Sequence, residues 1–523
     1  MRLRNLTLAL LAAVVLTGCA TNPVTGRKEI HLVSEGQEVQ IGQQYYGPSR
    51  QSQGGDYVTD PRVTEYVRQV GNRLAAVADR PLPYEFVVLN SSELNAWALP
   101  GGKIAINRGL LVELNNEAEL AAVLGHEIVH AAARHGAQQM EKGQLLQIGA
   151  AVASIGAAVY GGSELGQVVG QGAAVGAQLL QAKYGRDDEL ESDHYGMKYM
   201  KLAGYDLQAA VSLQELFVRK YSAGTEQDWM TGLFASHPPS QERVDANRRT
   251  MMAMGGPGGD LGKDRYQAAV AALRRAAPAY EKHQQALAAA NKGDYATARR
   301  LASEAAKMEP RESRFHGLLG DLAMAEKNPR AALPYFQKAG ELDPGYFKPM
   351  VQAGVAHYQL GNRAAAEPLL ERSMKLLPTA PGAYYLGRVN EDRGNTAGAV
   401  ELYKMAASSK SPVGEEALGR LVRLDLAQNP ETYLSIQPQL DSQGRVWLTV
   451  GNRTTMPVSN VTLIVGVVDQ SGRTAYGPER VGTGGNVIPG RKAVNVRTSL
   501  GPFDSGEVLR YVKWKVESAR PAQ

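Results

Sequence analysis

The sequence has only one cysteine, Cys19, among its 523 residues. A single thiol excludes any disulfide within the chain, even in a compartment that would allow one. With 44% apolar and 21% charged residues, the composition is that of ordinary globular domains. The length corresponds to about three domains of about 150 residues each.

The chain also lacks a large charge of one sign. Its formal net charge is +5, and two of the positive charges, Arg2 and Arg4, lie in a segment that we expect to be removed. No block of basic residues is interleaved with aromatic residues. This balance indicates neither a nucleic acid nor an acidic substrate as a partner.

Apolar runs as long as the roughly 20 residues of a membrane-spanning helix are missing too. The first run, residues 6–16, follows two positive charges and has the length of a secretion signal. The next tetrapeptide, Leu16-Thr17-Gly18-Cys19, resembles the lipobox of bacterial lipoproteins, in which the cysteine is diacylated and becomes the first residue. We therefore expect a signal peptide over residues 1–18 and a lipid anchor at Cys19. An uncleaved membrane anchor is the alternative.

The residue after the lipobox cysteine is not an aspartate. For a lipoprotein, this absence implies sorting to the outer membrane of a Gram-negative cell envelope, facing the periplasm. The resemblance therefore makes the membrane a partner through lipidated Cys19.

Residues 265–428 are almost wholly helical in pattern and contain a repeat. A proline recurs every 34 residues, and a turn marker and a small residue recur in step with it. The prolines are Pro310, Pro344, Pro378 and Pro412, and the small residues are Ala298, Ala332, Ala366 and Ala399. This period is typical of the tetratricopeptide repeat, a helix pair that stacks on its neighbours and forms a concave groove. The alternative is a generic helical bundle.

Residues 430–523 instead alternate apolar and polar positions. The alternation predicts a small β-sandwich that serves as a structural or docking module. The positions that share a face are Val461, Leu463, Val465 and Val467 in one strand, and Val512, Trp514 and Val516 in another.

The chemistry is concentrated in the sequence His126-Glu127-Ile128-Val129-His130. Apolar residues around it recur at helical spacing, so the two histidines point to one side of a buried helix and can share a metal. Glu127 lies beside them and can take a proton from metal-bound water. The alternative is a pair of satisfied core histidines, although two of them flanking a glutamate are costly to bury without a purpose.

A third ligand has to come from elsewhere. One class of zinc proteases uses a histidine in an extended motif, but that position is Gly136 here and His135 is one place off. We expect His135 to stay near the helix end, away from the metal. Another class uses a glutamate from a later helix, for which Glu189 is the candidate, with Asp193 four residues on and facing the same side. A solvated acidic face is the alternative.

Five motifs in order make a more specific case. They are Asn22–Gly26, Asn95-Ala96-Trp97 leading to Pro100–Ile104, the metal motif at 126–130, Glu189 with Asp193, and His237-Pro238-Pro239 with Arg243. The chain from 22 to about 243 resembles the gluzincin peptidases related to the CAAX prenyl protease and the heat-shock protease HtpX, peptidase family M48, in the lipoprotein branch with tetratricopeptide repeats. The resemblance implies one zinc ion per chain, held by His126, His130 and Glu189. It implies Glu127 as the catalytic base and Asp193 as support for a ligand.

The predicted fold class is therefore α+β. A mainly helical zincin peptidase domain spans residues 19–254, a tetratricopeptide-repeat solenoid spans 265–428, and the β-sandwich spans 430–523. Two apolar stretches between the halves of the metal motif, 145–160 and 165–180, are rich in small residues. We expect them to form a helical hairpin over the active site, with contact with a membrane surface as the alternative.

Substrate binding is expected at an edge strand over residues 103–107. An extended peptide can pair with such an edge and so cross the metal. The binding residues would be Asn95, Lys103, Ile104, Ala105 and Ile106.

His237 has three possible roles. In relatives a histidine here either stabilises the tetrahedral oxyanion or occupies the open zinc position and holds the enzyme inactive. The third possibility is a helix-start residue fixed by two prolines. Arg243 could support His237 or a substrate carbonyl.

The expected function is a zinc-dependent endopeptidase that degrades or processes misfolded or stalled proteins of the cell envelope. Its partners would be polypeptide substrates and a protein held in the repeat groove, for which the outer-membrane assembly machinery is a candidate. We expect no nucleic-acid partner. The alternative is a latent protease that acts as a chaperone or assembly scaffold. A cell-wall hydrolase is a third reading, but no glycan-binding feature supports it.

Overall fold

The computed structural model describes residues 19–142, 184–223 and 233–522. The expected signal peptide and the two apolar stretches between residues 145 and 180 lie outside the described residues. Among the residues that are described, no helix is both long enough and apolar enough to cross a membrane.

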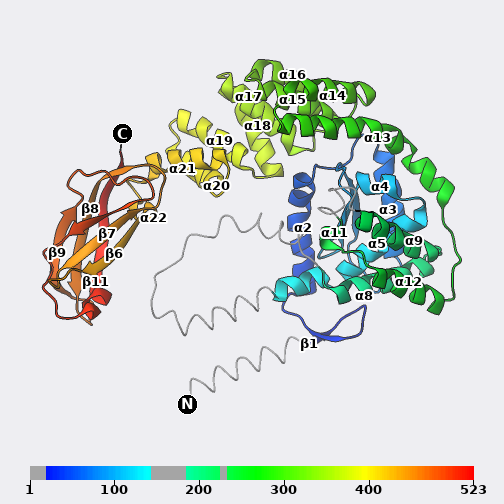
Figure 1. Ribbon diagram of the computed structural model, residues 1–523, viewed down its shortest axis with the longest axis horizontal. Helices are drawn as coiled ribbons and strands as arrows, with labels where there is room; N and C mark the ends of the chain where they lie inside the picture. The colour runs from blue at the N-terminus through cyan, green and yellow to red at the C-terminus, as the bar shows by residue number, and fades with distance from the viewer. Residues whose placement is uncertain (1–18, 143–183, 224–232, 523) are drawn as a thin grey trace, which may run out of the picture. The chain divides into compact units, whose positions relative to one another are not determined.

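The chain forms two compact units, residues 1–356 and 357–523 (Figure 1). The first unit holds two short strands, a three-stranded sheet and the helices that surround it. These helices are α2 (Glu35–Ser52), α3 (Pro61–Ala75), α4 (Arg108–Glu113), α5 (Glu117–Ala132), α8 (Arg186–Leu202), α9 (Gln208–Ala223), α11 (Leu233–Ser236) and α12 (Gln241–Ala253).

The strands of the first unit form two sheets. The short strands β1 (Cys19–Thr21) and β2 (Lys28–Ile30) pair antiparallel with each other. The larger sheet has the order β3-β5-β4, from β3 (Glu85–Leu89), β5 (Lys103–Asn107) and β4 (Ala96–Leu99). Strand β3 runs parallel to β5, and β4 runs antiparallel to it.

The prediction that residues 103–107 form an edge strand is therefore wrong. Lys103, Ile104, Ala105 and Ile106 lie in the central strand, where both edges are already paired. Every residue of β5 is buried, and strands covered on both faces lose the alternation that marks one solvated face. The edge strands of this sheet are β3 and β4, one on each side of β5.

Helix α5 lies in the core and packs against α8. All its residues except Ala122 are buried. Two glycines let the backbones of α5 and α8 come close: a methyl group on Gly125 would lie 3.2 Å from the carbonyl oxygen of Gly196, and one on Gly196 would lie 3.1 Å from the amide nitrogen of His126. This close approach brings the acidic face of α8 to the histidines of α5.

The repeat region is a series of antiparallel helix pairs. In the first unit they are α13 (Lys263–Asn291) with α14 (Tyr295–Met308), α15 (Ser313–Ala325) with α16 (Pro329–Leu342), and the start of α17 (Phe347–Gln359). The small residue predicted in each second helix is fully buried at Ala298, Ala332, Ala366 and Ala399. This burial explains why a small side chain recurs there.

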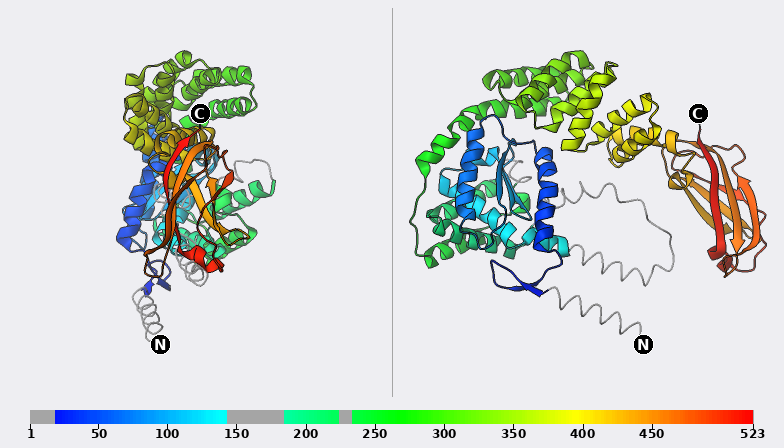
Figure 2. Two further views of the ribbon diagram at one scale, coloured as in Figure 1. Left: turned by 90° about the vertical axis from the view of Figure 1, so that its left-hand side faces the viewer. Right: turned by 180° about the vertical axis from the view of Figure 1, so that it is seen from behind.

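The second unit continues the helices and ends in strands. Its helices are α18 (Arg363–Leu376), α19 (Ala380–Asp392), α20 (Thr396–Ala407), α21 (Pro412–Asp425) and α22 (Pro430–Tyr433). Two antiparallel sheets follow toward the C-terminus (Figure 2). Their strand orders are β10-β7-β6 and β11-β8-β9. The strands are β6 (Leu434–Leu440), β7 (Val446–Asn452), β8 (Val458–Val468), β9 (Thr474–Gly482), β10 (Ala493–Arg497) and β11 (Val512–Pro521), with a 3-10 turn at Gly506–Tyr511.

The alternation predicted for the strands is present. Val461, Leu463, Val465 and Val467 of β8 are buried in an apolar cluster shared by the two sheets. Trp514 of β11 is 40% exposed although Val512 and Val516 beside it are buried. The α+β class with terminal sheets is thus confirmed.

Candidate metal centre

Four side chains from three separate segments converge in the core of the first unit. His126 and His130 lie one turn apart on α5, with their Nε2 atoms 3.0 Å from each other. Glu189 comes from the first turn of α8, and His237 precedes α12. One ligand atom from each of the four lies within 4.8 Å of the others, and all four residues are buried. Nitrogen and carboxylate donors at this spacing could hold a metal ion.

A buried ion-pair network orients the ligand residues. Asp193 Oδ1 lies 2.9 Å from His126 Nδ1, so it accepts the proton there and leaves Nε2 free. Arg243 donates to both oxygens of Asp193 over 2.7 and 2.8 Å, and its Nη1 lies 2.7 Å from Glu189 Oε2. A fourth contact, to the Pro238 carbonyl at 3.2 Å, fixes Arg243 relative to the start of α12.

Charged neighbours shift the pKa values of the carboxylates in this site in the direction opposite to the effect of burial. Burial by itself would raise the pKa of Glu189, but His237 and Arg243 outweigh it and hold that pKa well below its usual range. Asp193 follows the same pattern, because Arg243 outweighs burial and lowers its pKa. Burial lowers the pKa of His130 well below its usual range, so the ring is neutral and can be a ligand. Both carboxylates are therefore ionised beside the neutral ring of His130.

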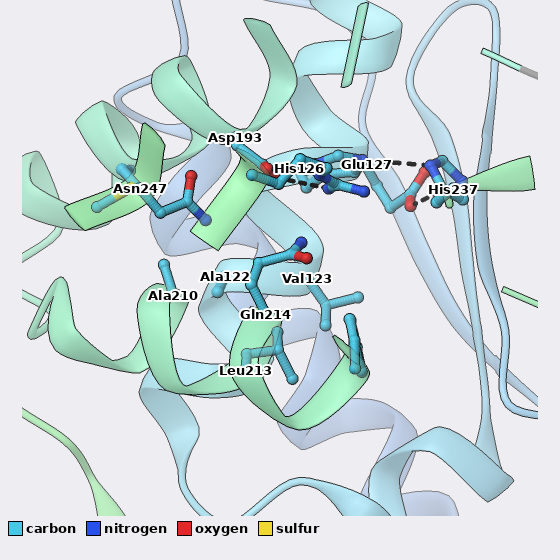
Figure 3. A pocket seen from close by; sticks show the side chains of 13 residues that line it. Ala122, Val123, His126, Glu127, Asp193, Ala210, Leu213, Gln214, His237 and Asn247 are labelled. Atoms are coloured by element: carbon cyan, nitrogen blue, oxygen red, sulfur yellow. Dashed lines mark hydrogen bonds and ion pairs between the residues drawn. The ribbon is translucent and has the colours of Figure 1, made fainter. Parts of the chain in front are cut away.

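Glu127 lies beside this cluster (Figure 3). Its Oε1 is 3.7 Å from His237 Nε2. Its Oε2 is buried and has no hydrogen-bond partner among the described residues. Burial raises the pKa of Glu127. An unpartnered buried carboxylate oxygen beside a metal-ligand cluster fits a proton acceptor for a water molecule bound there.

A cavity of about 40 Å³ opens beside His126 and Glu127. One wall carries the polar side chains of the site, and Ala122, Leu213 and Gln214 lie across from them (Figure 3). The lining is mainly apolar. Asn95, Lys103, Ile104, Ala105 and Ile106, which we predicted to bind substrate, do not line this cavity.

The sequence reasoning missed one aromatic residue of the site, Tyr184, and one contact of another, His135. The ring of Tyr184 stacks on the ring of His130, with centroids 3.8 Å apart and an angle of 26°. His135 is outside the four-residue cluster, as expected, but its Nδ1 lies 2.9 Å from His130 Nδ1. No motif marks Tyr184, and the position of His135 depends on how the chain turns after α5.

The sequence resembles known proteins over these same elements. Residues 61–250 match the model of peptidase family M48, and residues 283–347 and 323–388 match tetratricopeptide-repeat models. The chain is 28% identical over 260 residues to the beta-barrel assembly-enhancing protease of Escherichia coli (strain K12), which covers 47% of this chain and 52% of that protein. The protein of the same name from Yersinia pestis is 27% identical over 395 residues, covering 70% of this chain and 79% of that protein.

A further relative is aligned over a shorter part of this chain. Metalloprotease YcaL of Escherichia coli (strain K12) is 30% identical over 183 residues, covering 35% of this chain and 66% of that protein. The alignment with the first beta-barrel assembly-enhancing protease spans about half of that protein's length. Both predictions, the metallopeptidase family and the repeats, are confirmed by these matches. The chain therefore carries a domain of peptidase family M48 followed by tetratricopeptide repeats.

Proposed function

We propose that the protein is a zinc-dependent endopeptidase with one zinc ion per chain. The observation that carries the proposal is the convergence of His126, His130 and Glu189 beside Glu127. Two imidazoles and a carboxylate are the donor set of many catalytic zinc sites, in which a fourth position stays open for water. Bound zinc would supply a Lewis acid and lower the pKa of that water.

Side chains of the protein would supply the other functions that the reaction needs. Glu127 is placed to take a proton from the attacking water and to pass it to the leaving amine. Asp193 and Arg243 hold His126 and Glu189 in position. The cavity beside Glu127 has the place and the apolar lining for a substrate side chain.

Cleavage of casein by the chain from residue 20 onward tests this proposal. The expected result is cleavage that a chelator stops and that is absent in Glu127→Gln, which keeps the shape of the side chain but cannot take the proton. Equal cleavage by the wild type and Glu127→Gln would contradict it. A metal-loaded protein that cleaves no polypeptide would favour a latent protease acting as a chaperone or scaffold.

A specific observation favours latency in the conformation described. His237 Nδ1 lies 2.9 Å from Glu189 Oε1 and 3.3 Å from His126 Nε2, which puts it within the ligand cluster. We infer that His237 can fill the fourth metal position and hold the enzyme inactive. His237→Ala should then raise the rate of casein cleavage. A collapse of that rate would instead assign His237 to stabilisation of the oxyanion.

We also propose where the enzyme acts. The lipobox-like sequence before Cys19 and the similarity to beta-barrel assembly-enhancing proteases support a lipid-anchored protein of the outer membrane, facing the periplasm. Misfolded or stalled envelope proteins would be the substrates. The repeat groove would hold a protein partner, with the outer-membrane assembly machinery as the candidate.

A further inference from the structure

The second histidine of the metal motif has an unusual neighbour. His130 turns Nε2 toward His126 and Glu189, and its Nδ1 lies 2.9 Å from Nδ1 of His135. His135 is 2% exposed, and its Nε2 lies 3.2 Å from Glu191 Oε1. The three side chains thus form a line from the metal cluster to the edge of α8.

Hydrogen-bond chemistry fixes the protons along this line. Two nitrogens 2.9 Å apart share one proton, and a metal ligand needs an unprotonated nitrogen. If His130 offers Nε2 to a metal, its proton is on Nδ1, and His135 Nδ1 must accept the hydrogen bond from it. The proton of His135 is then on Nε2, from where it is donated to the carboxylate of Glu191. This assignment satisfies every nitrogen in the line.

The other ligating histidine is oriented differently. His126 donates from Nδ1 to Asp193, a carboxylate that Arg243 holds in place. Among the described residues no carboxylate lies at Nδ1 of His130, and the imidazole of His135 takes that role. Tyr184 stacks on the face of the His130 ring, and His135 contacts its edge at Nδ1. Together the two contacts fix the orientation of the ring.

The backbone explains why His135 reaches this place. Helix α5 ends at Ala132, and Arg134 adopts a left-handed conformation with φ of 67°. This turn returns His135 over the helix end instead of continuing the helix. Arg134 is held there by hydrogen bonds to Glu38 and to the Val33 carbonyl. The extended motif of other zinc proteases is defined by the spacing of residues along a helix or through a glycine turn. It therefore does not predict where a histidine lies after a left-handed arginine.

We propose that His135 is a positioning residue for the metal site: its Nδ1 accepts the hydrogen bond from His130 Nδ1–H and so fixes the tautomer that presents Nε2 to the ion. The inference rests on the proposed zinc site. The Ser192 hydroxyl, 3.4 Å from the same His135 nitrogen, makes the longer contact and is a secondary partner. Removing a partner of this kind from a metal-ligating histidine lowers metal affinity by about 10- to 100-fold.

Zinc affinity of the full chain, measured by competition with a chromophoric chelator, tests the proposal without any cleavage assay. His135→Leu fills the space but cannot accept a proton, so its zinc affinity should fall by about 10- to 100-fold. His135→Asn places an amide oxygen near the former Nδ1 and should keep an affinity close to that of the wild type. His194→Leu, an exposed histidine on α8, is the matched control and should bind as the wild type does.

The outcomes separate the inference from the proposed function. Wild-type affinity in His135→Leu overturns the inference, as does an equal loss in His135→Leu and His135→Asn, which would show a packing role only. If His135→Leu does not fold, judged by circular dichroism of the metal-free chain, Glu191→Ala replaces it. That variant frees His135 and should weaken zinc binding by about tenfold, and unchanged affinity overturns the inference. A wild type that binds no zinc overturns the proposed function itself.

Discussion

At the scale of single residues, the site depends on charges that are buried together. Asp193 and Glu189 remain ionised in the core because Arg243 contacts both carboxylates and His237 lies beside Glu189. The sequence identified these three residues through motifs, because their spacing along α8 and α12 is regular. It could not identify Tyr184 or the contact of His135, because both depend on how irregular backbone returns to α5.

Arg243→Gln should destabilise the first unit strongly. Removing one partner of a buried ion pair leaves uncompensated charge, which costs about 3–5 kcal/mol. Urea unfolding in the presence of a chelator measures the change without a contribution from metal binding. Arg248→Gln, an exposed position on the same helix, is the control and should change stability little. Equal stability of Arg243→Gln and the wild type would show that the network contributes nothing to folding.

At the scale of helices and strands, the residues that form turns could be predicted from the sequence, but the pairing partners of the strands could not. The repeat marker predicted from the sequence corresponds to a left-handed residue that ends one helix and a cap that begins the next. Asp294, Asn328, Asn362 and Asn395 each accept a hydrogen bond from the amide three residues on. In contrast, the central place of β5 arises from pairing with β3, a strand outside its hairpin, and a short apolar run does not record that pairing.

One repeat has a lysine at a left-handed position where the other repeats have glycine. Lys327 has φ of 58° at the position where the other repeats have Gly293, Gly361 and Gly394. A side chain in the left-handed region costs about 1 kcal/mol, so Lys327→Gly should raise the free energy of unfolding by about that amount. Thermal denaturation measures the shift.

The control for Lys327→Gly is an exposed lysine in an ordinary conformation. Lys292 ends α13 with φ of −87°, so Lys292→Gly relieves no strain and adds freedom to the unfolded chain. It should lower stability. If both variants shift the denaturation midpoint in the same direction, the conformational argument for Lys327 fails.

At the scale of the whole molecule, the peptidase part and the first repeats share one compact unit. Tyr266 of α13 donates to the carbonyl of Leu111, and Tyr280 donates to Glu312, which also accepts from Asn90 beside the sheet. The sequence predicted the three regions from changes of period. The sequence did not predict that the peptidase part and the first repeats form one unit, because polar contacts between distant segments produce no periodic pattern in the sequence.

The stability of the first unit should fall in mild acid. Burial, helped by Arg314 and Arg108, lowers the pKa of His283 in the repeats to about 3, against 6.5 for an exposed histidine. As pH falls below 6.5, the unfolded chain binds a proton that the folded chain does not, so stability is lost progressively toward pH 3. The contribution of His283 to this loss between pH 7.5 and pH 5 is about 2 kcal/mol.

His283→Gln isolates this effect from other titrating groups. Asp343, whose pKa burial raises to about 6, changes stability in the opposite direction over the same range. The comparison of urea unfolding at the two pH values, wild type against His283→Gln, cancels that contribution. The variant should lose about 2 kcal/mol less than the wild type on acidification. An identical loss in both proteins would show that His283 is not the acid-sensitive group.

We propose that the cluster of His126, His130 and Glu189 holds a zinc ion, and the zinc content of the purified chain measures this without an activity assay. Elemental analysis after zinc loading and desalting should give one zinc per chain for the wild type and for Glu127→Gln. His126→Ala, folded as judged by circular dichroism, should retain almost none. A folded wild-type chain without zinc, or a His126→Ala variant that keeps a full equivalent, would contradict the account.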